Sequence, residues 1–113
     1  AAMSSVHFKL DNLVVTIDRN NFQQTGASKD IMNYNDLKKM WESFGYYTLE
    51  VDGHNFDELL KAYNDNSEKS KPKIVIANTI KGKGISFAEN DNNWHHAVLT
   101  KNLYDKAMEE LKK

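Results

Sequence analysis

Residues 13–17 read Leu-Val-Val-Thr-Ile, and the chain continues over residues 18–23 as Asp-Arg-Asn-Asn-Phe-Gln. A short, β-branched and almost uninterrupted apolar run is typical of a strand that is buried on both faces of a parallel sheet. In open α/β sheets, ligands bind beyond the carboxyl ends of the strands. We therefore predict a strand at 13–17, followed by a polar loop from Asp18 to Gly26 that is the first place to look for chemistry.

Two more strands and two more helices follow in alternation. The strands are predicted at 46–51 and 73–78, and apolar residues recur at helical spacing over 37–44 and 56–63. A helix before the first strand and another after Thr100 complete the order. This alternation is that of a three-layer α/β domain, helices on both sides of a mostly parallel sheet.

The helix ends carry recognisable signals, with one exception. Asn35 or Asp36 is expected to cap the helix at 37–44, and Gly45 to end it. The first helix starts at Ala1 with no capping side chain and no acidic residue in its first turn. We interpret this start as a chain that begins part-way through an element. The apolar face of that helix is expected to comprise Met3, Val6, His7 and Leu10, with His7 packed and hydrogen-bonded.

Length and composition exclude several classes of protein. The chain has 113 residues, 15 basic and 16 acidic, with a net charge of -1 and no cysteine. Binding to a phosphate backbone needs a concentrated positive charge, and reading of bases favours arginine, but Arg19 is the one arginine in this nearly neutral chain. We therefore expect no nucleic acid partner. Disulfides, thiolate metal sites and cysteine nucleophiles are excluded. No apolar run of about 20 residues and no signal-peptide pattern is present, so we expect no membrane association and a cytoplasmic location.

A long segment without clear periodicity, from Thr79 to Leu99, follows the third predicted strand. It opens with Lys-Gly-Lys-Gly at 81–84. Glycines let backbone N–H groups approach an anion closely, and lysines supply positive charge for a diphosphate; a flexible, solvated loop is the alternative. His95, later in the segment, is a candidate for acid–base chemistry or phosphate contact. Its neighbour His96 does not make a metal pair with it, because adjacent side chains seldom converge on one ion.

The polar loop after the first predicted strand offers oxygen donors. An asparagine side chain at position 20 or 21 and a nearby main-chain carbonyl would suit a hard divalent cation, although asparagine pairs also occupy ordinary turns. The stretch Asp52-Gly53-His54-Asn55 is interpreted as a turn that caps the next helix rather than as a catalytic pair. No glycine-rich dinucleotide fingerprint or Walker loop is present.

Several spaced motifs together resemble transketolases. They run through the whole chain in the family's order: Lys9-Leu10-Asp11-Asn12-Leu13, Asp18-Arg19-Asn20-Asn21-Phe22-Gln23, Asp52-Gly53-His54, Lys81-Gly82-Lys83-Gly84, Glu89-Asn90 and Trp94-His95. The chain is most similar to the C-terminal portion of the N-terminal subunit of split transketolases, in which the diphosphate-binding and pyrimidine-binding domains are separate polypeptides. The resemblance implies the αβα thiamine-diphosphate-binding fold, with residues 1–113 forming the C-terminal part of the domain.

The resemblance also implies a cofactor, a metal and site residues. Thiamine diphosphate would bind with Mg²⁺ or Ca²⁺, held by the side chain of Asn20 and the carbonyl of Phe22, with Asn21 as the alternative register. Lys81 and Gly82 would lie against the cofactor. His95 would contact the diphosphate and approach the reacting carbon, as the catalytic residue that stabilises charge there. Two positions depart from the family pattern: Gln24 where an apolar residue is common, and His96 where glycine is common.

The family's Gly-Asp-Gly motif is absent, and its aspartate would fall roughly ten residues before Ala1. The implied function is transfer of a two-carbon ketol unit from a ketose phosphate to an aldose phosphate. The implied partner is a C-terminal, pyrimidine-binding transketolase subunit, in a heterotetramer or a dimer of the full enzyme. We expect the 113 residues alone to be inactive. The alternatives are another thiamine-diphosphate enzyme, such as a deoxyxylulose-phosphate synthase or a 2-oxoacid dehydrogenase component, and a non-catalytic α/β interaction domain.

Overall fold

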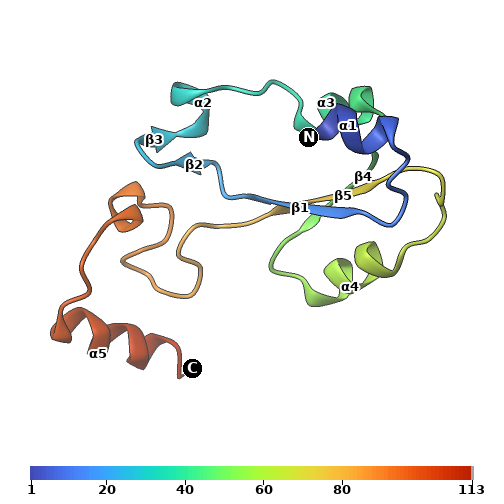
Figure 1. Cartoon of the computed structure of the whole chain (residues 1–113). Helices are drawn as coiled ribbons and strands as arrows, with labels where there is room; N and C mark the ends of the chain where they lie inside the picture. The colour runs from blue at the N-terminus through green and yellow to red at the C-terminus, as the bar shows by residue number, and fades with distance from the viewer. Residues whose placement is uncertain (113) are drawn as a thin grey trace. The chain divides into compact units, whose positions relative to one another are not determined.

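The computed structural model describes residues 1–112, which form two compact units. We call them the sheet unit, residues 1–19 with 34–79, and the loop unit, residues 20–33 with 80–112. The sheet unit contains α1 (Ala2–His7), β1 (Val14–Arg19), α3 (Leu37–Phe44), β4 (Tyr47–Asp52), α4 (Phe56–Asn64) and β5 (Lys73–Asn78). The loop unit contains β2 (Phe22–Gln23), β3 (Gly26–Ala27), α2 (Ser28–Ile31), the 3₁₀ helix η1 (Asn92–His95) and α5 (Lys101–Glu110) (Figure 1).

A parallel three-stranded sheet forms the centre of the sheet unit. The strand order is β1-β5-β4, and both outer strands run parallel to β5. Ile74, Val75 and Ile76 of β5 are fully buried, as a central strand between two helical layers requires. At the carboxyl edge Arg19 of β1 and Asp52 of β4 are both register partners of Asn78. The predicted parallel sheet and its three strands are therefore confirmed.

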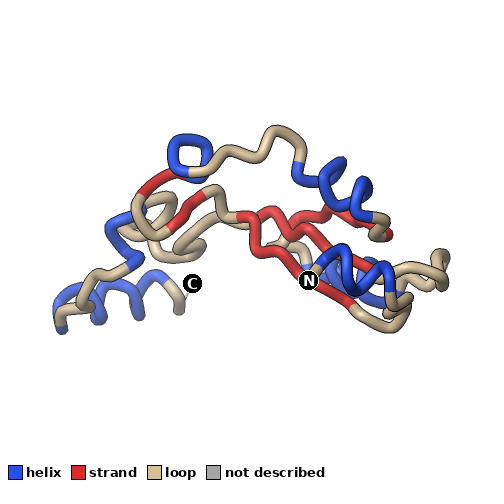
Figure 2. The backbone as a smooth tube through the Cα atoms, turned by 45° about the horizontal axis from the view of Figure 1, so that its top comes forward, coloured by secondary structure: helices blue, strands red, loops and turns tan. Residues whose placement is uncertain are grey.

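Helices cover the two faces of this sheet. α1 and α3 lie together on one side and α4 on the other, which gives the three layers predicted (Figures 1 and 2). The Asp36 side chain accepts the N–H of Lys39 at 3.0 Å and caps α3, while Gly45 ends that helix with φ 95°. Asn55 caps α4 by accepting two main-chain N–H groups of its first turn. The turn interpretation of 52–55 agrees with this geometry.

Two burial predictions are wrong. β1 is not buried on both faces: its residues alternate between exposed and half-buried, and Val14 is 44% exposed. Within residues 1–112, β1 pairs with β5 alone and takes an outer position in the sheet. The predicted face of the first helix is also open, because Met3, His7 and Leu10 are exposed. The His7 ring lies edge-on to its neighbour Phe8 rather than in a core.

One lysine is buried where the sheet meets α4. Lys73, the first residue of β5, is only 7% exposed. Its ammonium group donates to the carbonyls of Ala62 at 3.1 Å, Tyr63 at 2.9 Å and Asp65 at 2.6 Å. These carbonyls lie at the C-terminus of α4, where a helix leaves acceptors without intrahelical partners and carries partial negative charge. Lys73 therefore closes the end of α4 from the neighbouring strand.

Side-chain hydrogen bonds link other elements of the sheet unit. The buried hydroxyls of Ser5 in α1 and Tyr46, just before β4, are hydrogen-bonded to one another. After α4, the Asp65 carboxylate accepts the main-chain N–H of Ser67 at 2.8 Å and the hydroxyl of Tyr47 at 3.0 Å. These hydrogen bonds, foremost that from the Ser67 main chain, hold the pKa of Asp65 below its usual range.

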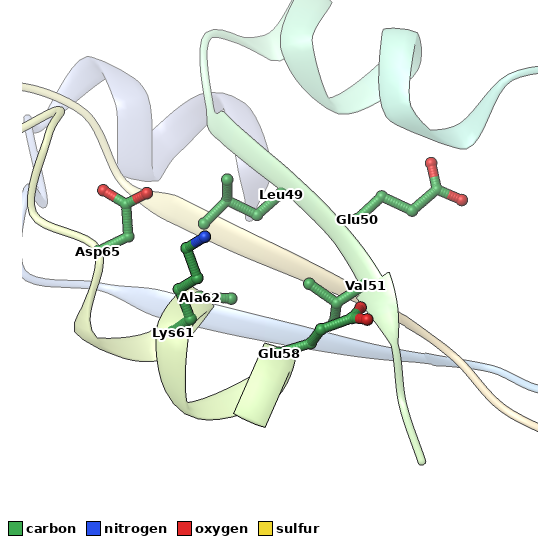
Figure 3. A pocket seen from close by; sticks show the side chains of 7 residues that line it. All are labelled: Leu49, Glu50, Val51, Glu58, Lys61, Ala62 and Asp65. Carbon is green, nitrogen blue, oxygen red and sulfur yellow. The ribbon is translucent and has the colours of Figure 1, made fainter. Parts of the chain in front are cut away.

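Two hollows in the sheet unit contain none of the predicted site residues. The first, beside β4 and α4, encloses about 240 Å³ and is lined by Leu49, Glu50, Val51, Glu58, Lys61, Ala62 and Asp65 (Figure 3). Two of its acidic groups already have partners: Glu58 accepts the N–H of Asp52 at 2.9 Å, and Glu50, which points away from Lys61, accepts the guanidinium of Arg19 at 2.9 Å. The second, of about 370 Å³, opens beside the amino ends of β1 and β5 and includes Asp11, Val14 and Lys73.

Candidate cofactor site

All five predicted site residues lie in the loop unit. The first two belong to the segment that follows β1. The Asn20 side-chain oxygen accepts the N–H of Phe22 at 2.9 Å, and Asn21 between them has φ 65°, the left-handed conformation that asparagine tolerates. The segment that we predicted to be a loop is a small hairpin, in which Phe22 pairs with Ala27. This hydrogen bond and the left-handed Asn21 fix the Asn20 side chain relative to the main chain of Phe22.

The Lys-Gly-Lys-Gly loop is closed on itself. Gly82 has φ 73°, and a Cβ atom there would lie 2.4 Å from the carbonyl oxygen of Ala88. The N–H of Gly84 donates to the Glu89 carboxylate at 2.9 Å, and the N–H of Asn90 donates to the carbonyl of Lys81 at 2.9 Å. The loop itself thus requires glycine at position 82, and the Gly84 amide is bound by a carboxylate of the same loop.

His95 is the last residue of η1. Asp91 caps this short helix by accepting the N–H of Asn93 at 2.9 Å. The indole N–H of Trp94 donates to the carbonyl of Phe87 at 2.9 Å, and the two rings lie 5.1 Å apart. The residue before His95 is thereby attached to the loop that carries Lys81 and Gly82. His95 itself is exposed, and its ring lies edge-on to the ring of His96.

Gln24 joins the hairpin to η1. Its main-chain carbonyl accepts the side-chain N–H of Asn92 at 3.3 Å, and its side-chain nitrogen lies 3.3 Å from Nε2 of His96. The two positions that depart from the family pattern are therefore in contact. Sequence reasoning identified both positions but did not pair them, because 72 residues separate them.

A family model described as the transketolase thiamine diphosphate-binding domain matches residues 1–112. The chain belongs to this family. An apulose-4-phosphate transketolase subunit from Phocaeicola vulgatus is 36% identical over 112 residues, which cover 98% of this chain and 40% of that protein. The 6-deoxy-6-sulfo-D-fructose transketolase subunit SqwG of a Clostridium species is 36% identical over 114 residues, covering 100% of this chain and 42% of its own length.

The fold of this transketolase domain agrees with solved relatives. The crystal structure of transketolase from Campylobacter jejuni superposes with a TM-score of 0.88 at 30% identity, and the match covers 98% of this chain and 17% of that one. The chain spans about two-fifths of the length of the curated subunits that it matches. Among residues 1–112, no helix of the transketolase domain is long and apolar enough to cross a membrane.

The donor set of the transketolase domain suits a hard cation only in part. The side-chain oxygen of Asn20 and the carbonyl of Phe22 are oxygen ligands of the kind that Mg²⁺ and Ca²⁺ prefer. Within residues 1–112, no group of three His, Asp or Glu side chains could hold a metal ion. Asn92 also has a buried side-chain oxygen without a hydrogen-bond donor among these residues. The residues present thus fit part of a metal shell and require further ligands.

A polar cluster connects the strands that precede the two site segments of the transketolase domain. Within the sheet unit, the guanidinium of Arg19 donates to the carboxylate of Glu50 at 2.9 Å, and the Asn78 amide donates to the same oxygen at 2.9 Å. The N–H of Thr79 donates to the Arg19 carbonyl at 3.2 Å, and its hydroxyl donates to Asp18. Sequence reasoning missed this cluster, although Arg19 was conspicuous as the one arginine.

Proposed function

We propose that the protein to which this chain belongs is a transketolase, which transfers a two-carbon ketol unit from a ketose phosphate to an aldose phosphate with thiamine diphosphate as cofactor. The family match over residues 1–112 is the observation that carries the proposal. The loop unit adds support, because Gln24 joins the hairpin of Asn20 and Phe22 to the segment of His95.

Each site residue then has a defined task. The side chain of Asn20 and the carbonyl of Phe22 would hold Mg²⁺ or Ca²⁺, which would neutralise the diphosphate. Lys81 would supply positive charge beside the cofactor, and Gly82, which has no side chain, would let the main chain approach it closely. His95 offsets negative charge on the diphosphate or on the reacting carbonyl oxygen. Thiamine diphosphate supplies, when bound, the nucleophilic carbon that takes up the two-carbon unit.

We also propose that this chain is the C-terminal part of the diphosphate-binding domain of a split transketolase. Relatives of about two and a half times its length are named transketolase subunits. The remaining part of the domain would add a carboxylate to the metal shell, and a partner subunit would bind the aminopyrimidine ring. We expect the 113 residues alone to have no activity. Two-carbon transfer by the isolated chain would contradict this part of the proposal.

Calorimetry on the full-length subunit in complex with its partner tests the cofactor site. Thiamine diphosphate should bind in a Mg²⁺-dependent manner, and Asn20→Ala should weaken binding at least tenfold because a metal ligand is lost. The matched control is Asn21→Gly, since glycine keeps the left-handed backbone at that position and removes only the amide. If only the Asn21 variant loses affinity, the ligand is Asn21 instead.

The same measurement separates the proposal from a non-catalytic α/β interaction domain, which would show no metal-dependent affinity for the cofactor. Substrate class requires a panel of ketose and aldose phosphates assayed with the assembled enzyme. Because relatives are named for apulose 4-phosphate and for 6-deoxy-6-sulfo-D-fructose, the panel also includes these two ketoses, the second of which carries a sulfonate in place of a phosphate. Turnover of a 2-oxoacid, or of pyruvate with glyceraldehyde phosphate, in place of these ketoses would favour another thiamine-diphosphate enzyme.

A further inference from the structure

Helix α5 is attached to the loop that contains Lys81 and Gly82. The carboxylate of Glu110, the last residue of α5, accepts two hydrogen bonds from Ser86: one from the main-chain N–H at 2.6 Å and one from the hydroxyl at 2.7 Å. Along the same helix, the ammonium group of Lys106 lies 5.3 Å from the ring centre of Phe87. Both contacts are within the loop unit.

Ser86 lies at the start of a tight turn. The N–H groups of Ala88 and Glu89 both donate to the carbonyl of Ile85, at 2.8 and 3.1 Å. The first N–H groups of such a turn have no carbonyl within it to bind, as at the N-terminus of a helix. A carboxylate that receives one of them, together with the adjacent hydroxyl, acts as an N-cap supplied from another element. Hydrogen bonds to a charged acceptor are also about twice as strong as neutral ones.

The turn at 85–89 contacts both the glycine loop and the residue before His95. Ala88 is the residue against which Gly82 packs, and the Glu89 side chain holds the Gly84 amide. The Phe87 carbonyl holds the indole of Trp94, the residue before His95. A shift of the turn would therefore move the glycine loop and His95 together.

We propose that Glu110 is a positioning residue of the cofactor site: its carboxylate fixes the turn at 85–89 and so holds the Lys81–Gly82 loop and η1 in the arrangement that binds the diphosphate. This inference rests on the proposed thiamine-diphosphate function. It gives α5, which contributes no candidate ligand of its own, a defined part in cofactor binding.

Amide hydrogen exchange tests the structural half of the inference without cofactor. In the full-length subunit in complex with its partner, Glu110→Ala should speed exchange over residues 84–89 about tenfold, because two charge-assisted hydrogen bonds are lost. Glu110→Gln, which keeps the side-chain shape and one acceptor oxygen, should have a smaller effect. The matched control is Glu109→Gln, an exposed residue of the same helix, which should exchange like the unsubstituted protein. Unchanged exchange in Glu110→Ala would overturn the inference.

Cofactor titration tests the functional half. The dissociation constant for thiamine diphosphate with Mg²⁺ should rise about tenfold in Glu110→Ala and partly recover in Glu110→Gln, while kcat at saturating cofactor changes much less. A variant that is merely less stable would lose active protein and kcat instead. Faster exchange with an unchanged dissociation constant would refute the positioning role. If the unsubstituted protein binds no thiamine diphosphate, the proposed function fails, and the exchange experiment still decides whether Glu110 holds the turn.

Discussion

Replacing Lys73 by methionine tests how α4 is held on the sheet. The substitution keeps a long, flexible, apolar side chain in the buried position and removes the ammonium group. Three carbonyl oxygens at the end of α4, between 2.6 and 3.1 Å from Nζ, then lose their donor. The expected effect on the free energy of unfolding is a balance of two opposing changes.

Hydrogen bonds to charged groups contribute about 1.5–3 kcal/mol each, so the three bonds represent at most about 5–9 kcal/mol. The ammonium group costs several kcal/mol to bury, and the variant no longer bears that cost. Water also reaches part of the helix end, because Tyr63 and Asn64 are exposed. We therefore expect Lys73→Met to lower the free energy of unfolding by about 2–4 kcal/mol.

Urea unfolding of the full-length subunit measures this loss as a lower midpoint with an unchanged m-value. Hydrogen exchange should show the loss first in peptides from α4 and β5. Lys69→Met, a change at an exposed lysine nearby in sequence, is the control and should stay within about 0.5 kcal/mol of the unsubstituted protein. Equal stability of the two variants would refute the argument that Lys73 closes the helix.

Three further predictions concern single positions. Gly82→Ala should abolish thiamine diphosphate binding in calorimetry, because its Cβ would lie 2.4 Å from the Ala88 carbonyl oxygen and its φ is 73°. The control Gly26→Ala should bind normally, because its Cβ would lie 3.4 Å from the Ile31 side chain, an ordinary contact distance. The lowered pKa of Asp65 means that its ionised form stabilises the fold. This contribution is present above about pH 4 and is lost as the pH falls through the folded-state pKa. Asp65→Asn should therefore flatten that part of an acid-unfolding curve, and an unaltered curve would contradict the prediction. Tyr46→Phe should cost about 1 kcal/mol in urea unfolding by removing the buried hydrogen bond to α1, and a loss below about 0.3 kcal/mol would show that the bond is not needed.

Hydrophobic periodicity and helix-capping residues were enough to predict the order of strands and helices in the sheet unit. The apolar run at 73–78 became β5 with the same bounds, since a central strand is buried on both sides and its sequence shows it. Asp36 and Gly45 marked the ends of α3 because caps and left-handed stops depend on the local chain alone. Thr100 likewise caps α5, where its hydroxyl accepts the N–H of Leu103.

Burial and long-range pairing could not be predicted in the same way. The residues of β1 have the composition of a buried strand, but their exposure depends on which elements pack beside them. The hairpin at 22–27 has strands of two residues each, too short for an alternating pattern to show. The contacts of Gln24 with His96 and of Glu110 with Ser86 join side chains far apart in sequence, and no local signal marks them.

The register of β1 with β5 bears on the order in which the protein folds. The contacts of Gln24 with Asn92 and His96 close chain loops of 68 and 72 residues, which costs about 4 kcal/mol of chain entropy from an unfolded chain. If the parallel strands pair first, Arg19 and Asn78 become neighbours. Only the short segments from Arg19 to Gln24 and from Asn78 to His96 then remain to be ordered. The site segments should therefore come together after the sheet in refolding. Substitutions in the sheet that touch no ligand should then slow the recovery of cofactor affinity.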